Sequence, residues 1–329
     1  MSSSLECRLC GRPFDGSPEE TFVDLGMSPV SPQYLTIDQL DQPEVFQPLH
    51  VRVCPDCLLV QLPAHPPDGA GSTVDTLESA ADLRGFAAQL AERTNPDGVV
   101  TVEFGHLLSL VSKRQYDAIG PAQRSYFSLF TASRALAGAG LAVTDVAELA
   151  DPRGLLRAYA RLAPAPAGES VERVLALERL AGLHGLGGHI GFDGVVVELR
   201  RALLEFLFNA RAEGRTVVGY GAPASANTLL SHCGIRPDLM AYTVDDSPIR
   251  QGKFLPGSRI PIYPPERIEA DRPDYVVVLP WEMRPQVTQQ LAFVRHWGGR
   301  LVFPIPSLQF ENFGVYTRST RIITIDALA

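Results

Sequence analysis

The chain has few cysteines, no long apolar run and no excess of basic residues, and each shortage excludes a class of protein. No apolar run reaches the ~18 residues that a membrane-spanning helix needs. Lys and Arg number 29 against 37 Asp and Glu, giving a net charge of −8, so we expect neither nucleic acid nor an anionic membrane as a partner. Residues 1–6 lack the basic and apolar regions of a secretory signal, so we expect a cytoplasmic protein.

The composition is that of a globular protein with more than one domain. Its 329 residues correspond to about two or three domains. Hydrophobic residues make up 45% and charged residues 20%, a balance that allows a sizeable core.

Four of the five cysteines form two C-x-x-C pairs, Cys7 with Cys10 and Cys54 with Cys57. In a reducing compartment, doubled pairs are typical of metal ligands rather than of disulfides. Four thiolates suit tetrahedral Zn²⁺ and leave no open position for a substrate, so we predict a structural zinc site. The alternative is four unrelated reduced cysteines. Cys233 is expected to be a small core residue.

The apolar pattern predicts alternating helices and strands after a short strand at 51–53. Before residue 214, the expected helices cover residues 75–93, 133–139 and about 195–212, and the expected strands cover 99–104, 142–146 and 156–160. After it, the expected strands are 217–220, 239–244, 275–279 and 301–303, and the expected helices are 224–232, 264–269 and 285–296. This alternation is typical of a small parallel α/β domain.

Seven segments of the chain resemble the zinc-containing deoxysugar C-methyltransferases: residues 24–26, 96–104, 125–128, 217–224, 243–248, 251–257 and 273–281. Members of that family act on dTDP-4-keto sugars. The resemblance implies an N-terminal zinc domain, a central Rossmann domain for S-adenosylmethionine (SAM) and a C-terminal Rossmann-like domain. It also implies that a sugar nucleotide lies between the last two.

We therefore predict an α/β chain in three parts with a tail. The zinc-binding module is expected over residues 1–65 and a truncated Rossmann-type methyltransferase remnant over 66–190. A Rossmann-like nucleotide-sugar-binding domain is expected over 191–308, and residues 309–329 form the tail.

The segment that would hold SAM is short in this chain. Relatives place a strand, an acidic Gly-rich loop and a second strand before the helix expected at 75–93, whereas only residues 64–74 fill that space here. Gly69-Ala70-Gly71-Ser72 has no preceding strand, so we interpret it as a linker. SAM is not expected as a cofactor, and Zn²⁺ is.

The proton-transferring residues of the family are also replaced. Its Tyr-His-Glu-His segment corresponds to residues 120–123, which read Gly-Pro-Ala-Gln, and a further histidine corresponds to Ser79. Neither Ala nor Gln accepts a proton near neutral pH. The remaining candidates are His106, for which a structural role is the alternative, and Tyr126.

The C-terminal part keeps the candidate ligand-binding residues. A G-x-G turn between a strand and a helix suits a diphosphate, because backbone N–H groups and the helix dipole face the anion. Carboxylates at a second strand end are typical ligand contacts of α/β folds. These substrate-binding candidates are Tyr220, Gly221, Ala222, Pro223, Asn227, Asp245 and Asp246. The alternatives are a tight turn without ligand and carboxylates that cap a turn.

Three functions remain open at this point. The chain binds a nucleotide sugar or related intermediate without SAM, in secondary-metabolite biosynthesis; or it is a non-catalytic partner of a pathway protein; or it is a surviving SAM-dependent C-methyltransferase. We favour the first hypothesis, and whether the chain is an enzyme stays open.

Overall fold

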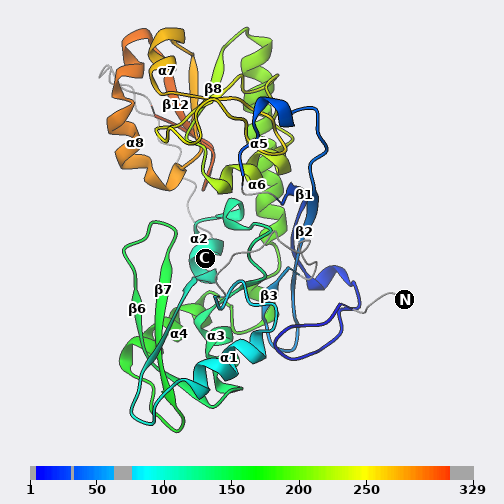
Figure 1. Ribbon diagram of the computed structural model, residues 1–329, viewed down its shortest axis with the longest axis vertical. Helices are drawn as coiled ribbons and strands as arrows, with labels where there is room; N and C mark the ends of the chain where they lie inside the picture. The colour runs from blue at the N-terminus through cyan, green and yellow to red at the C-terminus, as the bar shows by residue number, and fades with distance from the viewer. Residues whose placement is uncertain (1–4, 31–32, 63–75, 312–329) are drawn as a thin grey trace, which may run out of the picture.

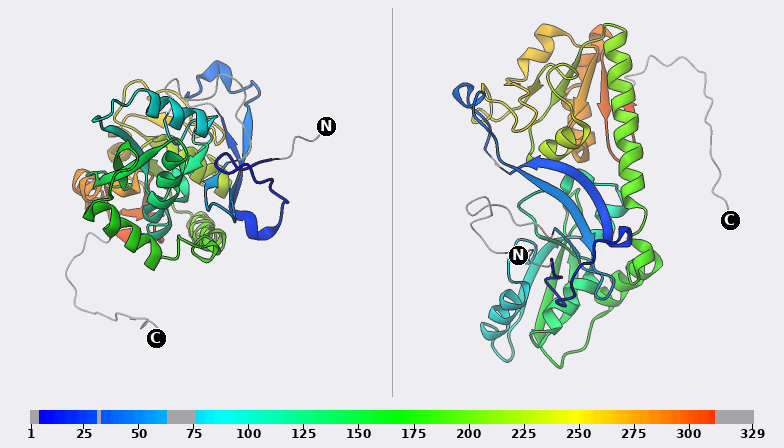
Figure 2. Two further views of the ribbon diagram at one scale, coloured as in Figure 1. Left: turned by 90° about the horizontal axis from the view of Figure 1, so that it is seen from below. Right: turned by 90° about the vertical axis from the view of Figure 1, so that its right-hand side faces the viewer.

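The computed structural model describes residues 5–30, 33–62 and 76–311, and they form two lobes (Figure 1). One lobe holds the N-terminal cysteines and the central part of the chain, and the other holds the C-terminal sheet. Helix α5 (Phe192–Ala212) and the hairpin β1–β2 (Thr21–Pro29, Phe46–Val53) run from one lobe to the other, as the right-hand view of Figure 2 shows. None of the helices in these residues is long and apolar enough to cross a membrane.

The N-terminal sheet has the strand order β1-β2-β3-β5 and is antiparallel. Strand β2 ends at Val53 and delivers Cys54, as predicted. Strands β3 (Val60–Gln61) and β5 (Ser125–Tyr126) pair although 64 positions separate Gln61 from its partner Ser125. Strand β1 was not predicted, because two irregularities in its pairing with β2 interrupt the alternation of buried and exposed side chains.

The central sheet has three antiparallel strands, in the order β4-β7-β6: β4 (Val100–Gly105), β6 (Leu141–Glu148) and β7 (Leu155–Leu162). The helices of this part of the chain are α1 (Leu83–Glu92), α2 (Leu107–Ser112), α3 (Leu129–Ala137) and α4 (Glu169–Leu180). The helix predicted over 75–93 begins only at Leu83, because the Asp82 side chain accepts a hydrogen bond from Gly85 N and caps it there. Helices α2 and α4 were not predicted.

The C-terminal sheet has the order β10-β9-β8-β11-β12-β13. Its strands are β8 (Val217–Tyr220), β9 (Thr243–Val244), β10 (Ile262–Tyr263), β11 (Tyr275–Val278), β12 (Arg300–Phe303) and β13 (Gln309–Glu311). The first five are parallel, and β13 is antiparallel to β12. A parallel sheet was predicted from four of these strands, whereas β10 was not predicted. Residues 309–311 therefore belong to the sheet and not to a tail, while the β-prone stretch 321–325 lies outside the described residues.

Three helices besides α5 belong to this lobe: α6 (Ala224–Cys233), α7 (Glu266–Asp271) and α8 (Arg284–Gln290). The helix predicted over 285–296 is divided into α8 and the 3-10 helix η6. The 3-10 helices are η1 (Pro18–Glu20), η2 (Ile37–Gln39), η3 (Tyr116–Ala118), η4 (Leu186–Gly188), η5 (Trp281–Met283) and η6 (Ala292–Trp297).

The structure has two hydrophobic cores, and their boundaries do not coincide with the three parts predicted along the sequence. One core joins the β1–β2 hairpin, α5 and the C-terminal sheet, with Phe22 stacked on Phe192 at 4.8 Å between ring centroids. The other joins Cys7, Cys54 and Cys57 to the central sheet and to α3. The predicted zinc site is therefore part of the core of the central lobe.

Candidate functional site

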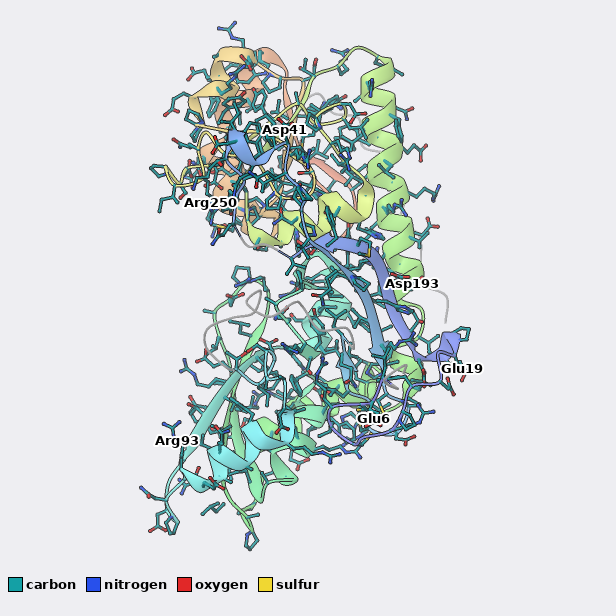
Figure 3. All side chains as sticks on the ribbon, turned by 45° about the vertical axis from the view of Figure 1, so that its right-hand side comes forward. Glu6, Glu19, Asp41, Arg93, Asp193 and Arg250 are labelled. Atoms are coloured by element: carbon teal, nitrogen blue, oxygen red, sulfur yellow. The ribbon has the colours of Figure 1, made fainter. Side chains whose placement is uncertain are left out.

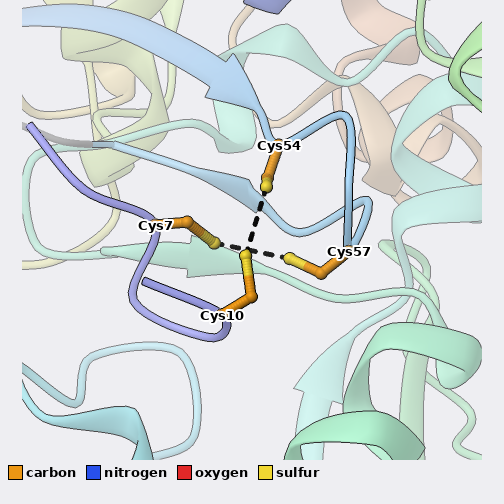
Figure 4. Close-up of side chains that lie close together, drawn as sticks. All are labelled: Cys7, Cys10, Cys54 and Cys57. Carbon is orange, nitrogen blue, oxygen red and sulfur yellow. Dashed lines mark hydrogen bonds between the residues drawn. The ribbon is translucent and has the colours of Figure 1, made fainter. Parts of the chain in front are cut away.

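The four predicted zinc ligands lie together, with all four Sγ atoms within 4.8 Å of one another (Figure 4). Cys7 Sγ lies 3.4 Å from Cys57 Sγ, and Cys10 Sγ lies 3.5 Å from Cys54 Sγ. Tetrahedral zinc with Zn–S bonds of about 2.3 Å separates its sulfurs by about 3.8 Å, so the thiol set fits Zn²⁺. Hydrogen bonds from the thiols of Cys54 and Cys57 lower the pKa of Cys7, which favours the thiolate that a metal needs.

Tight turns and one buried amide hold the cysteines in place. Gly11, with a φ of +80°, turns the first knuckle so that its N–H reaches Cys7 O at 2.8 Å. Leu58 N bonds Cys54 O at 2.8 Å in the second knuckle. The fully buried Gln61 donates from Nε2 to Cys7 Sγ at 3.1 Å and supports that ligand from outside the metal shell.

A cavity of about 500 Å³ lies where the two lobes meet, within the size range of small-molecule sites. It is lined by residues of β1, of the central part, of the start of α6 and of η5. The ionisable and polar side chains on its wall come from all four parts: Ser28, Glu78, His106, Asp117, Gln123, Tyr126, Arg153, Ser225, Asn227 and Glu282.

The side chain of Glu78, which precedes helix α1 in the sequence, lies beside Gly105 at the C-terminal end of strand β4. Its Oε1 accepts hydrogen bonds from Gly105 N at 3.0 Å and from Gln123 Nε2 at 3.2 Å. Burial raises the pKa of Glu78 to about 7. No sequence motif surrounds this residue, and only its place beside Ser79 could have drawn attention to it.

Asp117 and Trp281 connect the two lobes at the cavity. Trp281 Nε1 donates to Asp117 Oδ2 at 2.8 Å, and both side chains are buried. Burial raises the pKa of Asp117 to about 7. Burial also raises the pKa of Glu282. Trp281 thus both packs and lines the cavity.

His106 lines the cavity, and its side chain contacts a buried carboxylate. Its Nε2 lies 2.8 Å from Oε1 of Glu178, which has no exposed surface. Glu178 also accepts from the amides of Leu129 and Phe130, at 2.5 Å and 3.0 Å, at the start of α3. The structure therefore fixes the orientation of His106 and places it on the cavity.

Tyr126 is buried at the cavity, beside the replaced segment. Gly120 N donates to its hydroxyl at 3.2 Å, and burial raises the pKa of Tyr126. Residues 120–123 all line the cavity, so the positions of the missing family bases face it. The Gly-rich residues 69–72 lie outside the described residues.

The G-x-G turn is bonded within the protein. Gly221 N donates to Val244 O at 2.7 Å, and Ala222 N donates to Asp245 Oδ2 at 2.7 Å. These two amides are thus not available to a ligand in this conformation. Arg250, labelled in Figure 3, forms an ion pair with the same carboxylate, with 3.0 Å between Arg250 Nη1 and Asp245 Oδ2.

Asp246 lies at the same strand end. It accepts from Tyr220 Oη at 3.3 Å, and burial raises the pKa of Tyr220 to about 12. Of the substrate-binding candidates, the structure brings Asn227 to the cavity wall, together with His106 and Tyr126. It places Tyr220, Gly221, Ala222, Pro223, Asp245 and Asp246 outside the residues that line it.

Known families match both ends of the chain. Residues 7–69 match a family described as a putative zinc binding domain, and residues 153–306 match one described as the C-methyltransferase C-terminal domain. C-methyltransferase NovU of Streptomyces niveus is 35% identical over 228 residues, which are 68% of this chain and 53% of that protein.

The chain is thus similar to a C-methyltransferase over about two thirds of its own length. Its zinc-binding part is confirmed both by the family match and by the four clustered thiols. Because the chain spans about half the length of NovU, its own activity and substrate are matters of proposal.

Proposed function

We propose that the chain binds a nucleotide sugar or a related biosynthetic intermediate without using SAM, as a degenerate relative of the sugar C-methyltransferases. The cavity between the lobes carries this proposal. It has the size of a small-molecule site, and polar side chains of both lobes converge on it. A methyltransferase-related role in biosynthesis also agrees with the similarity to NovU.

The start of α6 supports an anionic group in the ligand. Ala224 and Ser225 open this ten-residue helix and line the cavity. The first amides of a helix have no partner within it, and the dipole favours negative charge there. Arg153 adds a cation to the cavity wall.

Independence from SAM is supported by the central sheet. Dinucleotide-type sites lie at the carboxyl ends of parallel strands, beside a Gly-rich turn. Within residues 76–190, the strands β4, β7 and β6 pair antiparallel with one another, and β5 pairs antiparallel with β3.

Calorimetry on the zinc-loaded chain tests both halves of the proposal. We expect saturable binding of dTDP and of a dTDP-4-keto sugar in competition for one site, and no saturable heat with SAM. Absence of binding by either dTDP compound would reject the proposed ligand. Saturable SAM binding would instead favour a surviving methyltransferase.

As a check on the location, Asn227→Ala at the cavity should weaken dTDP-sugar binding. The matched change Asn209→Ala, on the exposed surface of α5, should leave it unchanged. Equal affinities of both variants would place the ligand elsewhere.

A further inference from the structure

We propose that Glu78 is a catalytic proton acceptor, which removes a proton from the carbon next to a carbonyl group of the ligand bound in the cavity. This inference rests on the proposed function, since it needs a bound carbonyl sugar. It assigns chemistry to a residue outside the segment 120–123, where the resemblance would have placed it.

The carboxyl group of Glu78 is fixed through one oxygen. Gly105 N and Gln123 Nε2 both bond Oε1. Among the described residues, no hydrogen bond involves Oε2. A side chain held in this way keeps a defined orientation while one oxygen retains its lone pairs for a ligand proton.

Glu78 lies beside a stretch of the cavity wall that carries no base of its own. The wall formed by residues 120–123 contains no side chain that ionises near neutral pH, and Gln123, the last of them, contacts Glu78 directly. The side chain of Glu78 is partly buried and reaches the cavity surface.

The charged and titratable groups around Glu78 keep it suited to proton transfer. Arg153 lines the same cavity, and its positive charge opposes the effect of burial on the pKa of Glu78. Tyr126 and His106 line the cavity as well. With a pKa of about 7, a substantial fraction of Glu78 is ionised at neutral pH, and its basicity is close to the optimum for general-base catalysis.

The step balances without a cofactor. The C–H bond next to the carbonyl breaks, its proton goes to Glu78 Oε2, and the electron pair forms an enolate whose charge rests on the carbonyl oxygen. Return of a proton from Glu78 to the same carbon restores the ketone. In D₂O the returning particle is a deuteron, so the position becomes labelled with no net change in the sugar.

The test is proton–deuterium exchange of a dTDP-4-keto sugar, followed by NMR in D₂O with the zinc-loaded chain. We expect Glu78→Gln to lower the protein-dependent exchange rate by about 100-fold or more. The glutamine can still accept from Gly105 N, so dTDP affinity should stay within about twofold. The matched control Glu103→Gln changes an exposed β4 carboxylate that pairs with Arg157 and should exchange at the wild-type rate.

The pH profile separates a proton acceptor from a structural role. The wild-type rate should rise with pH and level off above an apparent pKa of about 7, and Glu78→Gln should lose that rise.

Wild-type exchange in Glu78→Gln would overturn the assignment of Glu78. Binding of the keto sugar by the wild-type chain without exchange would overturn the proton transfer and leave the binding function intact. Failure of the wild-type chain to bind would reject the binding function and this inference with it.

Discussion

Gly221 shows how one residue can be required for packing rather than for a ligand. Its φ is +84°, and a Cβ at this position would lie 2.5 Å from Cδ of Pro280. We expect Gly221→Ala to lower the free energy of unfolding by about 2–4 kcal/mol, from backbone strain and overpacking together. Urea unfolding measures this loss.

The control for this change is Gly252→Ala. Gly252 has a φ of +76° but no atom within 4 Å of its would-be Cβ, so only the backbone strain of about 1 kcal/mol applies. Equal losses in the two variants would show that Pro280 exerts no steric constraint.

Asp117 should make stability depend on pH in a direction opposite to that of a salt-bridged carboxylate. Its pKa is about 7 in the fold, above the value near 4 of an unfolded chain, so the folded state holds the proton more tightly. The free energy of unfolding therefore falls as pH rises from about 4 to 7, by up to ~1.4 kcal/mol per pH unit from this group. Glu78 contributes a slope of the same sign.

Asp117→Asn keeps an acceptor for Trp281 Nε1 and removes the charge, so it should flatten this slope. Thermal unfolding from pH 5 to 7 measures the difference from wild type. The matched change Asp41→Asn, on an exposed carboxylate, should leave the slope unchanged. A variant at position 117 with the wild-type slope would argue that Asp117 is ionised in the fold.

At the scale of elements, helix α3 depends on a side chain from α4. Glu178 accepts from the first amides of α3 and from His106, and it has no exposed surface. Glu178→Ala leaves these donors buried without a partner, and we expect a loss of about 3–5 kcal/mol in the free energy of unfolding. Glu172→Ala, on the exposed face of α4, should change it by less than about 0.5 kcal/mol. Chemical denaturation compares them, and similar small losses would mean that water satisfies those donors.

Regular elements with clear periodicity were predictable from the sequence, and irregular ones were not. Strand β4 has a run of β-branched residues and was predicted to within a residue. Strand β1 has an irregular register, and the helix predicted from residue 75 is delayed to Leu83 by the Asp82 cap. Local capping and strand pairing therefore outweighed the periodicity of apolar residues.

The zinc site was predictable from the sequence, whereas most residues of the cavity were not. Both cysteine pairs were predictable because each ligand pair lies within four residues. Glu78, Asp117 and Trp281 meet only through the packing of distant segments, and their raised pKa values come from burial that no local pattern encodes.

At the scale of the whole molecule, the two cores should respond differently to loss of metal. The cysteines belong to the core of the central lobe, whereas β8, β11 and β12 belong to the other core. Removal of zinc with a chelator should raise amide hydrogen exchange by at least tenfold in α3, β4 and β7 and leave the C-terminal strands protected, because zinc binding contributes directly to folding.

Mass spectrometry after exchange locates the change. Cys233→Ser, which leaves the zinc ligands intact, should retain wild-type protection in the central lobe. Equal deprotection of both sheets on chelation would mean that the two lobes unfold as one cooperative unit.

The pairing of β3 with β5 has a consequence for how any preparation of this protein is judged. Gln61 contacts the Cys7 thiol and pairs with Ser125, while its neighbour Val60 pairs with Tyr126 on the cavity wall. In a chain without its metal, Ser125 and Tyr126 would therefore lose the strand that holds them, and the cavity wall would not form at all. In a partly metallated sample, the apparent number of ligand sites per chain would then report the metallated fraction, while the affinity of the filled chains stays constant.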